Sequence, residues 1–164
     1  MSDAPSSPIP PNGPSNGQQQ AMPLQLNIQY TKDLSFEVPG APEIFVNLRE
    51  QPRVDLTLDV QARPVEGQQN VYEVSLQIRA DAKVQETSCF IAELVYCGVF
   101  TVNIPQEHLE PVLLVECPRL LFPFARNILA DVTRDGGFPP VLLAPIDFVA
   151  LWQSRRGGQQ VGTA

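Results

Sequence analysis

The sequence predicts an α+β fold: a four-stranded antiparallel sheet with two C-terminal helices packed on one side of it. Two observations lead to this prediction. Stretches in which apolar and polar residues alternate come first along the chain, and stretches with helical periodicity come only after them. Strands that follow one another without intervening helices favour an antiparallel sheet with the helices gathered afterwards. The 164 residues suffice for one domain with a core of ordinary size.

Three predicted strands carry their apolar side chains on one face. The first spans residues 24–36 and ends before the breaker Pro39-Gly40-Ala41-Pro42, after which a long connection follows. Residues 54–62 alternate strictly, and the pattern resumes over residues 72–81, so we expect these two strands to form a hairpin. The apolar residues of the first strand that share one parity are Leu24, Leu26, Ile28, Tyr30, Leu34 and Phe36.

The fourth predicted strand, residues 87–104, is apolar on both faces. Phe90 and Leu94 lie on one face, and Cys89 and Val95 lie on the other. Both faces therefore need cover from other parts of the protein.

The first predicted helix begins near Cys117-Pro118, because proline is favoured at the first helical position. It stops at Asp135-Gly136-Gly137, where glycine can adopt a positive φ. Leu120, Phe122 and Leu129 fall outside its expected stripe, so the helix presents apolar surface on more than one side. The stripe itself consists of Leu121, Phe124, Ala125, Ile128 and Val132.

An apolar connector over residues 138–145 separates this helix from the last one. Its three prolines make it too broken for a helix and unsuited to a central strand. Asp147 is the expected N-cap of the last helix, which is short.

The two ends of the chain are predicted to be tails. Residues 1–22 are rich in Pro, Ser, Asn, Gly and Gln, and too poor in large apolar side chains to offset the entropy of ordering. We expect a disordered tail over 1–22, a folded domain over 23–153 and a flexible C-terminal tail over 154–164.

The charge balance limits the possible partners. The 18 acidic and 11 basic residues give a net charge of −7, which repels phosphate backbones and anionic lipids. We therefore expect no nucleic acid and a basic protein partner. The chain has no apolar run of the roughly 18 residues that a membrane span needs and no secretory signal pattern, so we expect a cytoplasmic protein without direct membrane insertion. Cys89, Cys97 and Cys117 form no CxxC motif, and three thiols suit a reducing compartment.

The sequence offers no pattern for catalysis. The single histidine, His108, lies in a polar connection and is expected in solvent. Asp55 and Asp59 lie on the polar face of a regular strand, and Gly136-Gly137 follows a helix instead of introducing one. We predict no catalytic residue, no metal, no cofactor and no enzymatic activity.

More apolar surface remains than one interface between a sheet and a helix can bury. Oligomerisation explains it for the strand after residue 88 and for the first helix. A second explanation stays open beside the first: part of the surplus, above all the connector, lines a groove for unfolded polypeptide.

Several motifs in order resemble the SecB family of export chaperones. The first is Tyr30-Thr31-Lys32-Asp33-Leu34-Ser35-Phe36-Glu37, followed by the proline-glycine breaker. The second is the string from Cys117 to Arg126, CPRLLFPFAR. It is continued by GGFPP from Gly136 and LAPIDF from Leu143, and Tyr72-Glu73-Val74 agrees as well.

The resemblance implies a homotetramer, a dimer of dimers with helices packed between the dimers. It also implies an ATP-independent holdase that binds unfolded precursor proteins, keeps them competent for translocation and delivers them to the SecA motor ATPase. A scaffolding homo-oligomer that binds no client is the alternative.

Three sets of site residues follow from the pattern and the resemblance. Expected client-binding residues are Val54, Leu56, Leu58, Phe138, Leu142, Leu143, Phe148 and Trp152, each of which has a role in the core as its alternative. Expected SecA-binding residues are Asp33, Glu37, Ile91 and Glu93, for which a solvated face is the alternative. Expected subunit-interface residues are Cys89, Leu120, Phe122 and Leu129.

Overall fold

A computed structural model describes residues 21–160, the last three as backbone only. The tail predicted over residues 1–22 lies almost wholly outside this range. The strands are β1 (Leu24–Glu37), β2 (Arg53–Pro64), β3 (Val71–Val84) and β4 (Thr87–Val102). The helices are α1 (Glu43–Asn47), α2 (Leu109–Pro111), α3 (Cys117–Asp135) and α4 (Phe148–Gln160), with a 3-10 turn at Gln106–His108 and a π-helical segment at Val112–Glu116.

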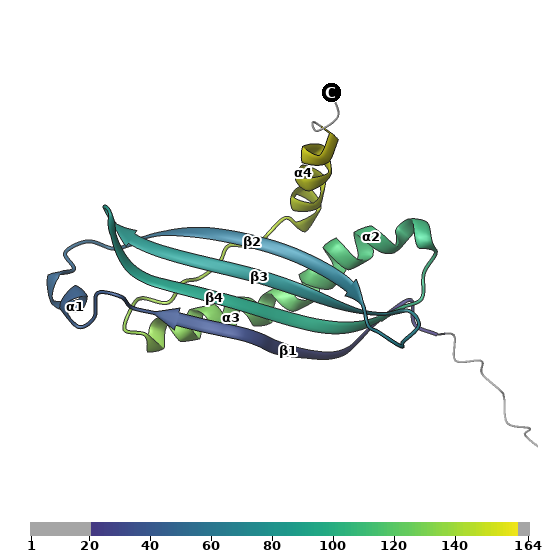
Figure 1. Ribbon diagram of the computed structural model, residues 1–164, viewed down its shortest axis with the longest axis horizontal. Coiled ribbons are helices and arrows are strands. Elements are labelled where there is room, and N and C mark those ends of the chain that lie inside the picture. Colours follow the sequence, from purple (N-terminus) through teal and green to yellow (C-terminus); the bar gives the residue numbers. More distant parts are fainter. Residues whose placement is uncertain (1–20, 161–164) are drawn as a thin grey trace, which may run out of the picture.

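As predicted, the four strands form one antiparallel sheet. Its strand order is β1-β4-β3-β2. Strands β2, β3 and β4 follow one another as hairpins, whereas β1 lies on the far side of β4 (Figure 1). The sheet therefore has two edges, one along β1 and one along β2. The strictly alternating residues of β2 and β3 pair one to one, for example Leu58 opposite Ile78.

Helix α3 runs along one face of the sheet, and the core lies between them (Figure 1). The strands contribute the apolar side chains that point to this face. Helix α3 contributes Leu121, Ala125 and Leu129, all fully buried. Gly98 of β4 permits this close approach, because a Cβ atom there would lie 2.8 Å from a methyl carbon of Leu121. We call this the inner face and the opposite one the outer face.

Two features of α3 differ from the prediction. The helical path starts earlier, because the polar connection predicted around His108 forms the 3-10 turn and α2. The π-helical segment, in which Leu113 and Val115 are buried, then leads into α3. The buried stripe is also rotated: Phe122 and Leu129 face the core, while Phe124 is 48% exposed. Added turns before Cys117 and a proline inside the helix shift which residues meet the sheet.

Strand β1 changes face twice, which corrects the single parity expected from its sequence. The register of its pairing with β4 shifts between Leu26 and Ile28 and again between Thr31 and Asp33. Each bulge inserts one residue, so the side chains between them move to the other face. Ile28 is consequently 57% exposed, and Tyr30 reaches the outer-face residue Glu73.

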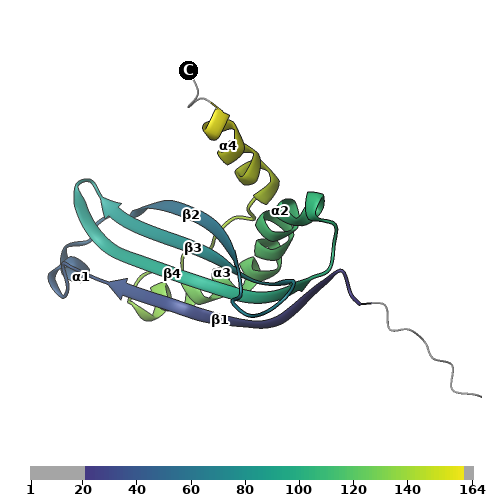
Figure 2. The ribbon, with the colours of Figure 1, turned by 45° about the vertical axis from the view of Figure 1, so that its right-hand side comes forward.

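The ends of the helices agree with the predicted signals. Helix α3 stops at Asp135, and Gly137 after it has φ 91°. The Asp147 carboxylate accepts a hydrogen bond of 3.0 Å from the Ala150 amide, as an N-cap does. Helix α4 extends into the segment predicted as a C-terminal tail and projects past the β2 edge (Figures 1 and 2). No described helix is both long and apolar enough to cross a membrane.

Candidate binding surfaces

An apolar groove lies between the start of β2 and the connector that follows α3. Its volume is about 290 Å³. Four of the predicted client-binding residues meet there: Val54 and Leu56 from β2, and Phe138 and Leu142 from the connector. The full lining is Gln51, Pro52, Val54, Leu56, Phe90, Phe138, Pro139, Pro140, Val141 and Leu142, none of which is charged.

The floor of this groove is fixed and its rim is exposed. Phe138 is 5% exposed and packs in tilted geometry against Phe90 and Phe45, at 4.9 Å and 5.2 Å between ring centroids. On the rim, Leu56 is 50% exposed and Leu142 67% exposed. The groove therefore offers apolar surface to a ligand while the protein remains folded.

Two hydrogen bonds to Thr133 hold the connector, one from the Phe138 amide to the Thr133 carbonyl oxygen at 3.1 Å and one from the Val141 amide. The Val141 amide donates to the Thr133 hydroxyl at 3.0 Å, which ties the connector to α3. Pro139 and Pro140 have no amide hydrogen, so this segment cannot pair with β2 as a regular strand. The space between β2 and the connector therefore stays open.

The other four predicted client-binding residues lie elsewhere. Leu143 and Phe148 are buried in the core, at 3% and 1% exposure, and Leu58 packs partly buried against it. Trp152 lines a second hollow of about 170 Å³ between α4 and the helical segment before α3. Its indole N–H donates to Glu110 at 2.9 Å.

The predicted acidic set lies on the outer face, where β1 pairs with β4. Glu37 stands opposite Ile91, and two residues further along, Ser35 stands opposite Glu93. Asp33 and Glu93 both line one shallow depression of the sheet surface. Glu93 forms an ion pair with Arg79, so Asp33 and Glu37 carry most of the unbalanced negative charge of this set.

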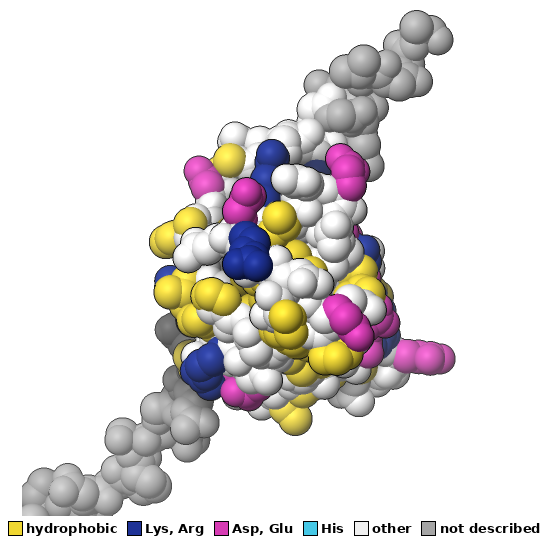
Figure 3. Space-filling model, turned by 90° about the vertical axis from the view of Figure 1, so that its left-hand side faces the viewer, with side chains coloured by type: hydrophobic (Ala, Val, Ile, Leu, Met, Phe, Trp, Pro, Cys, Tyr) yellow, Lys and Arg dark blue, Asp and Glu magenta, His cyan; other side chains and the backbone are white. Residues whose placement is uncertain are grey.

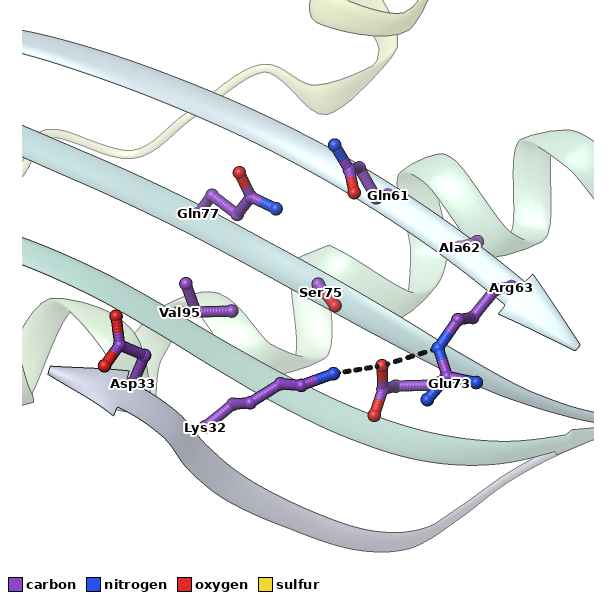
Figure 4. Close-up of a pocket in the computed structure, with 9 residues that line it drawn as sticks. All are labelled: Lys32, Asp33, Gln61, Ala62, Arg63, Glu73, Ser75, Gln77 and Val95. Carbon is purple, nitrogen blue, oxygen red and sulfur yellow. Dashed lines mark hydrogen bonds and ion pairs between the residues drawn. The ribbon is translucent and has the colours of Figure 1, made fainter. Parts of the chain in front are cut away.

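A buried ionic cluster on the same face was missed by the sequence reasoning. Glu73 of β3 is 5% exposed and accepts hydrogen bonds from Lys32 at 2.9 Å, from Arg63 at 3.1 Å and from the Tyr30 hydroxyl. Lys32 reaches it from β1, across the intervening strand β4, and Arg63 reaches it from the adjacent strand β2, so the two approach from opposite sides (Figure 4). The alternation in the sequence shows only that position 73 is polar. That three donors converge on Glu73 depends on how the strands pair in the sheet, which the sequence pattern does not reveal.

Charge and burial act in opposite directions on Glu73. Burial raises the pKa of its carboxyl, but the hydrogen bonds from Tyr30, Lys32 and Arg63 outweigh burial and lower the pKa to about 2. Burial and the bond to Glu73 raise the pKa of Tyr30. Glu73 is therefore a fixed negative charge near the start of β3, and it links side chains of β1, β2 and β3 on the outer face.

The predicted subunit-interface residues divide into exposed and buried ones. Leu120 is 46% exposed, whereas Phe122 is 8% exposed and Cys89 and Leu129 are fully buried within the chain. Leu120 and Phe124 together form an exposed apolar pair on α3. Apolar side chains are also exposed among acidic groups at the end of the molecule that carries α1 (Figure 3).

The thiols and the histidine are poorly placed for chemistry. Burial raises the pKa of the Cys117 thiol to about 12, and burial raises the pKa of Cys97 as well. A thiol with a raised pKa holds little thiolate and is a weak nucleophile. His108 is exposed in the 3-10 turn, as predicted.

Comparisons with known proteins agree with this architecture. A family model described as preprotein translocase subunit SecB matches residues 17–159. The chain is 64% identical over 159 residues to a protein-export protein SecB of Granulibacter bethesdensis, covering 93% of each chain. It is 60% identical to one of Acidiphilium cryptum, covering 84% of this chain and 91% of the other.

Among the solved structures that are similar in fold is a SecB-like chaperone of Mycobacterium tuberculosis in complex with a ChAD peptide from an antitoxin. The TM-score is 0.63 at 16% sequence identity, covering 75% of this chain and 90% of that one.

Proposed function

The chain belongs to the SecB family of protein-export chaperones, and we propose that it acts as an ATP-independent holdase. It binds unfolded precursor polypeptides, keeps them competent for translocation and delivers them to the SecA ATPase. The groove between β2 and the connector is its client-binding surface.

The observation that carries the proposal is the uncharged lining of this groove. An unfolded chain exposes apolar side chains, and a groove without charged groups can accept many different ones. Leu56 and Leu142 remain exposed although a closed fold would bury them. The groove thus distinguishes unfolded clients from folded ones, which hide their apolar side chains.

We assign delivery to the outer face and assembly to α3. Asp33, Glu37, Ile91 and Glu93 form an acidic and partly apolar patch that suits a basic segment of SecA. The exposed pair Leu120 and Phe124 offers an apolar contact for a second subunit, and the proposed assembly is a homotetramer, built as a dimer of dimers, in the cytoplasm. Several grooves on one particle then hold one long client through linked weak contacts.

The scaffolding alternative is not favoured. A scaffold needs apolar surface only where its subunits meet, and an uncharged groove with exposed leucines is not expected of it.

Suppression of aggregation tests the proposal. We expect the protein, without ATP, to delay light scattering by a denatured precursor at substoichiometric ratios of tetramer to precursor. Changing Leu56→Asp together with Leu142→Asp should weaken client binding about tenfold or more, because two leucine contacts are lost. Val46→Asp is the matched control, since Val46 is 77% exposed but does not line the groove. If the double variant binds clients as tightly as Val46→Asp does, the groove is not the client-binding surface.

A further inference from the structure

Strand β2 has an unpaired edge, and the contacts of Arg155 show which of its groups face outward. The Arg155 guanidinium donates hydrogen bonds to the backbone oxygens of Val60 at 3.1 Å and Leu58 at 3.4 Å. In an antiparallel strand, residues two apart direct their N–H and C=O groups to the same side. Val54 and Leu56, which precede them at the same parity, therefore also direct their backbone groups to this edge.

Arg155 occupies the second half of this edge. Besides the two backbone contacts, it forms an ion pair with Asp59, whose side chain has the opposite parity on the same strand. The guanidinium thus sits across the edge, and its N–H donors take the place that the amides of a fifth strand would occupy. Helix α4, which projects past β2, brings Arg155 to this position (Figure 2).

The first half of the edge is open and adjoins the groove. Among the described residues, Val54 and Leu56 make no backbone hydrogen bond outside the pairing with β3. The same two residues form the β2 wall of the uncharged groove. Free backbone groups and apolar surface are therefore presented together by one stretch of strand.

We propose that an extended segment of a non-native polypeptide adds to the free edge of β2 as a fifth strand, and that Arg155 caps the second half of this edge until a longer segment displaces it. The inference rests on the proposed client binding and specifies how the client backbone is held. The ligand is defined by its chemistry: an extended segment with alternating apolar residues and no proline.

The geometry explains both parts of this proposal. Every second side chain of an added strand points to the inner side of the sheet, where it can contact Phe138 and Leu142. The remaining side chains point to the outer side. Backbone pairing is independent of sequence, so it suits a ligand recognised by its unfolded state. The cap is weak enough to yield, because Arg155 and Asp59 have side chains 41% and 35% exposed, and such ion pairs contribute little.

Backbone methylation tests the pairing. The probe is a nine-residue peptide of alternating Leu and Thr with a Lys at each end, made in three forms: unmodified, N-methylated at every Leu, and N-methylated at every Thr. Only one parity of amides faces β2, so we expect one methylated form to bind about tenfold or more weakly and the other to bind within about twofold of the unmodified peptide. Fluorescence anisotropy measures the three affinities.

The outcomes separate this inference from the proposed function. Equal affinity of all three peptides, or an equal loss in both methylated forms, overturns strand addition while client binding stands. No binding of the unmodified peptide overturns the proposed client binding, and the inference with it.

The cap is tested by Arg155→Gln with peptides of five and nine residues. We expect the nine-residue peptide to bind about threefold or more tightly to the variant and the five-residue peptide to bind as before. Arg156→Gln is the control, because Arg156 stacks on Trp152 at 5.0 Å and is not seen to contact β2. Unchanged affinity of the longer peptide for Arg155→Gln overturns the role of Arg155.

Discussion

Lys32 of β1 and Glu73 of β3 meet across the intervening strand β4, with 2.9 Å between the Lys32 Nζ and a Glu73 carboxylate oxygen. The bulge beside Lys32 makes this contact possible by moving part of β1 to the outer face. Two strands that share no backbone hydrogen bond are thereby linked through side chains.

The first prediction concerns the stability that this contact provides. Glu73→Gln removes a buried charge that three donors satisfy, so we expect unfolding free energy at pH 7 to fall by about 1–3 kcal/mol. Urea denaturation followed by circular dichroism measures it. Glu93→Gln is the control, because Glu93 is 45% exposed and its pair with Arg79 should contribute less than about 1 kcal/mol. Equal losses in the two variants would contradict the special role of Glu73.

The second prediction concerns pH. The pKa of Glu73 is about 2 in the folded chain and 4.5 ordinarily, so its stabilisation is complete above about pH 4.5. It is lost progressively as the pH falls from about 4.5 to about 2. We therefore expect the stability difference between wild type and Glu73→Gln to shrink over this window. A difference that stays constant from pH 6 to pH 3 would show that the carboxylate is not the source.

The third prediction concerns the packing of α3 on the sheet. A Cβ atom at position 98 would lie 2.6 Å from a ring carbon of Phe100 and 2.8 Å from Leu121, closer than carbon atoms pack. Gly98→Ala should therefore destabilise the fold by about 1–3 kcal/mol, measured by urea denaturation. Gly157→Ala on α4 is the control, since nothing lies near it and alanine favours a helix. A neutral Gly98→Ala would mean that α3 is less tightly packed than described.

The fourth prediction concerns assembly. Leu120→Asp places a charge in the exposed apolar pair on α3, so we expect particles of about four chain masses to dissociate into dimers. Sedimentation velocity measures the masses. Val149→Asp is the control, because Val149 is also exposed but lies on α4. An unchanged mass for Leu120→Asp would place the interface elsewhere.

The fifth prediction concerns delivery. Asp33→Asn with Glu37→Gln removes two negative charges from the outer face, and we expect weaker SecA binding with unchanged client affinity. The matched control is Asp55→Asn, because Asp55 is on the outer face of β2 and away from β1. Isothermal titration calorimetry measures both affinities. A parallel loss of SecA and client binding would show that the two surfaces are not separate.

The fold was predictable because its strands follow local alternation. The alternation over the nine residues from Val54 to Ala62 indicates which face of β2 is apolar. The same alternation in β3 is sufficient to predict that the two strands pair. The bulges of β1 were not predictable in this way, because they depend on how β1 matches β4 and not on β1 alone. The prediction of which side of α3 is buried was wrong for a related reason. The turns before Cys117 determine the rotation of the helix about its axis, which buries Phe122 and exposes Phe124.

The candidate groove was predictable only in part. Phe138 and Leu142 are conspicuous as apolar residues beside prolines, and Val54 and Leu56 as half of an alternating strand. Leu143 and Phe148 show the same sequence character but lie inside the core, since local pattern does not reveal what covers a connector. Arg155 gave no signal at all, because its partners are backbone oxygens almost a hundred residues earlier in the chain.

The groove lining has no charged residue, whereas the outer face carries Asp33 and Glu37. We therefore expect the two surfaces to respond in opposite directions to ionic strength. Added salt shortens the Debye length, to about 8 Å at 0.15 M and about 3 Å at 1 M, and so weakens an encounter guided by Asp33 and Glu37. It leaves contacts with Leu56 and Phe138 intact or strengthens them. We therefore expect a rise in ionic strength to strengthen the proposed client contacts and to weaken the proposed encounter with SecA.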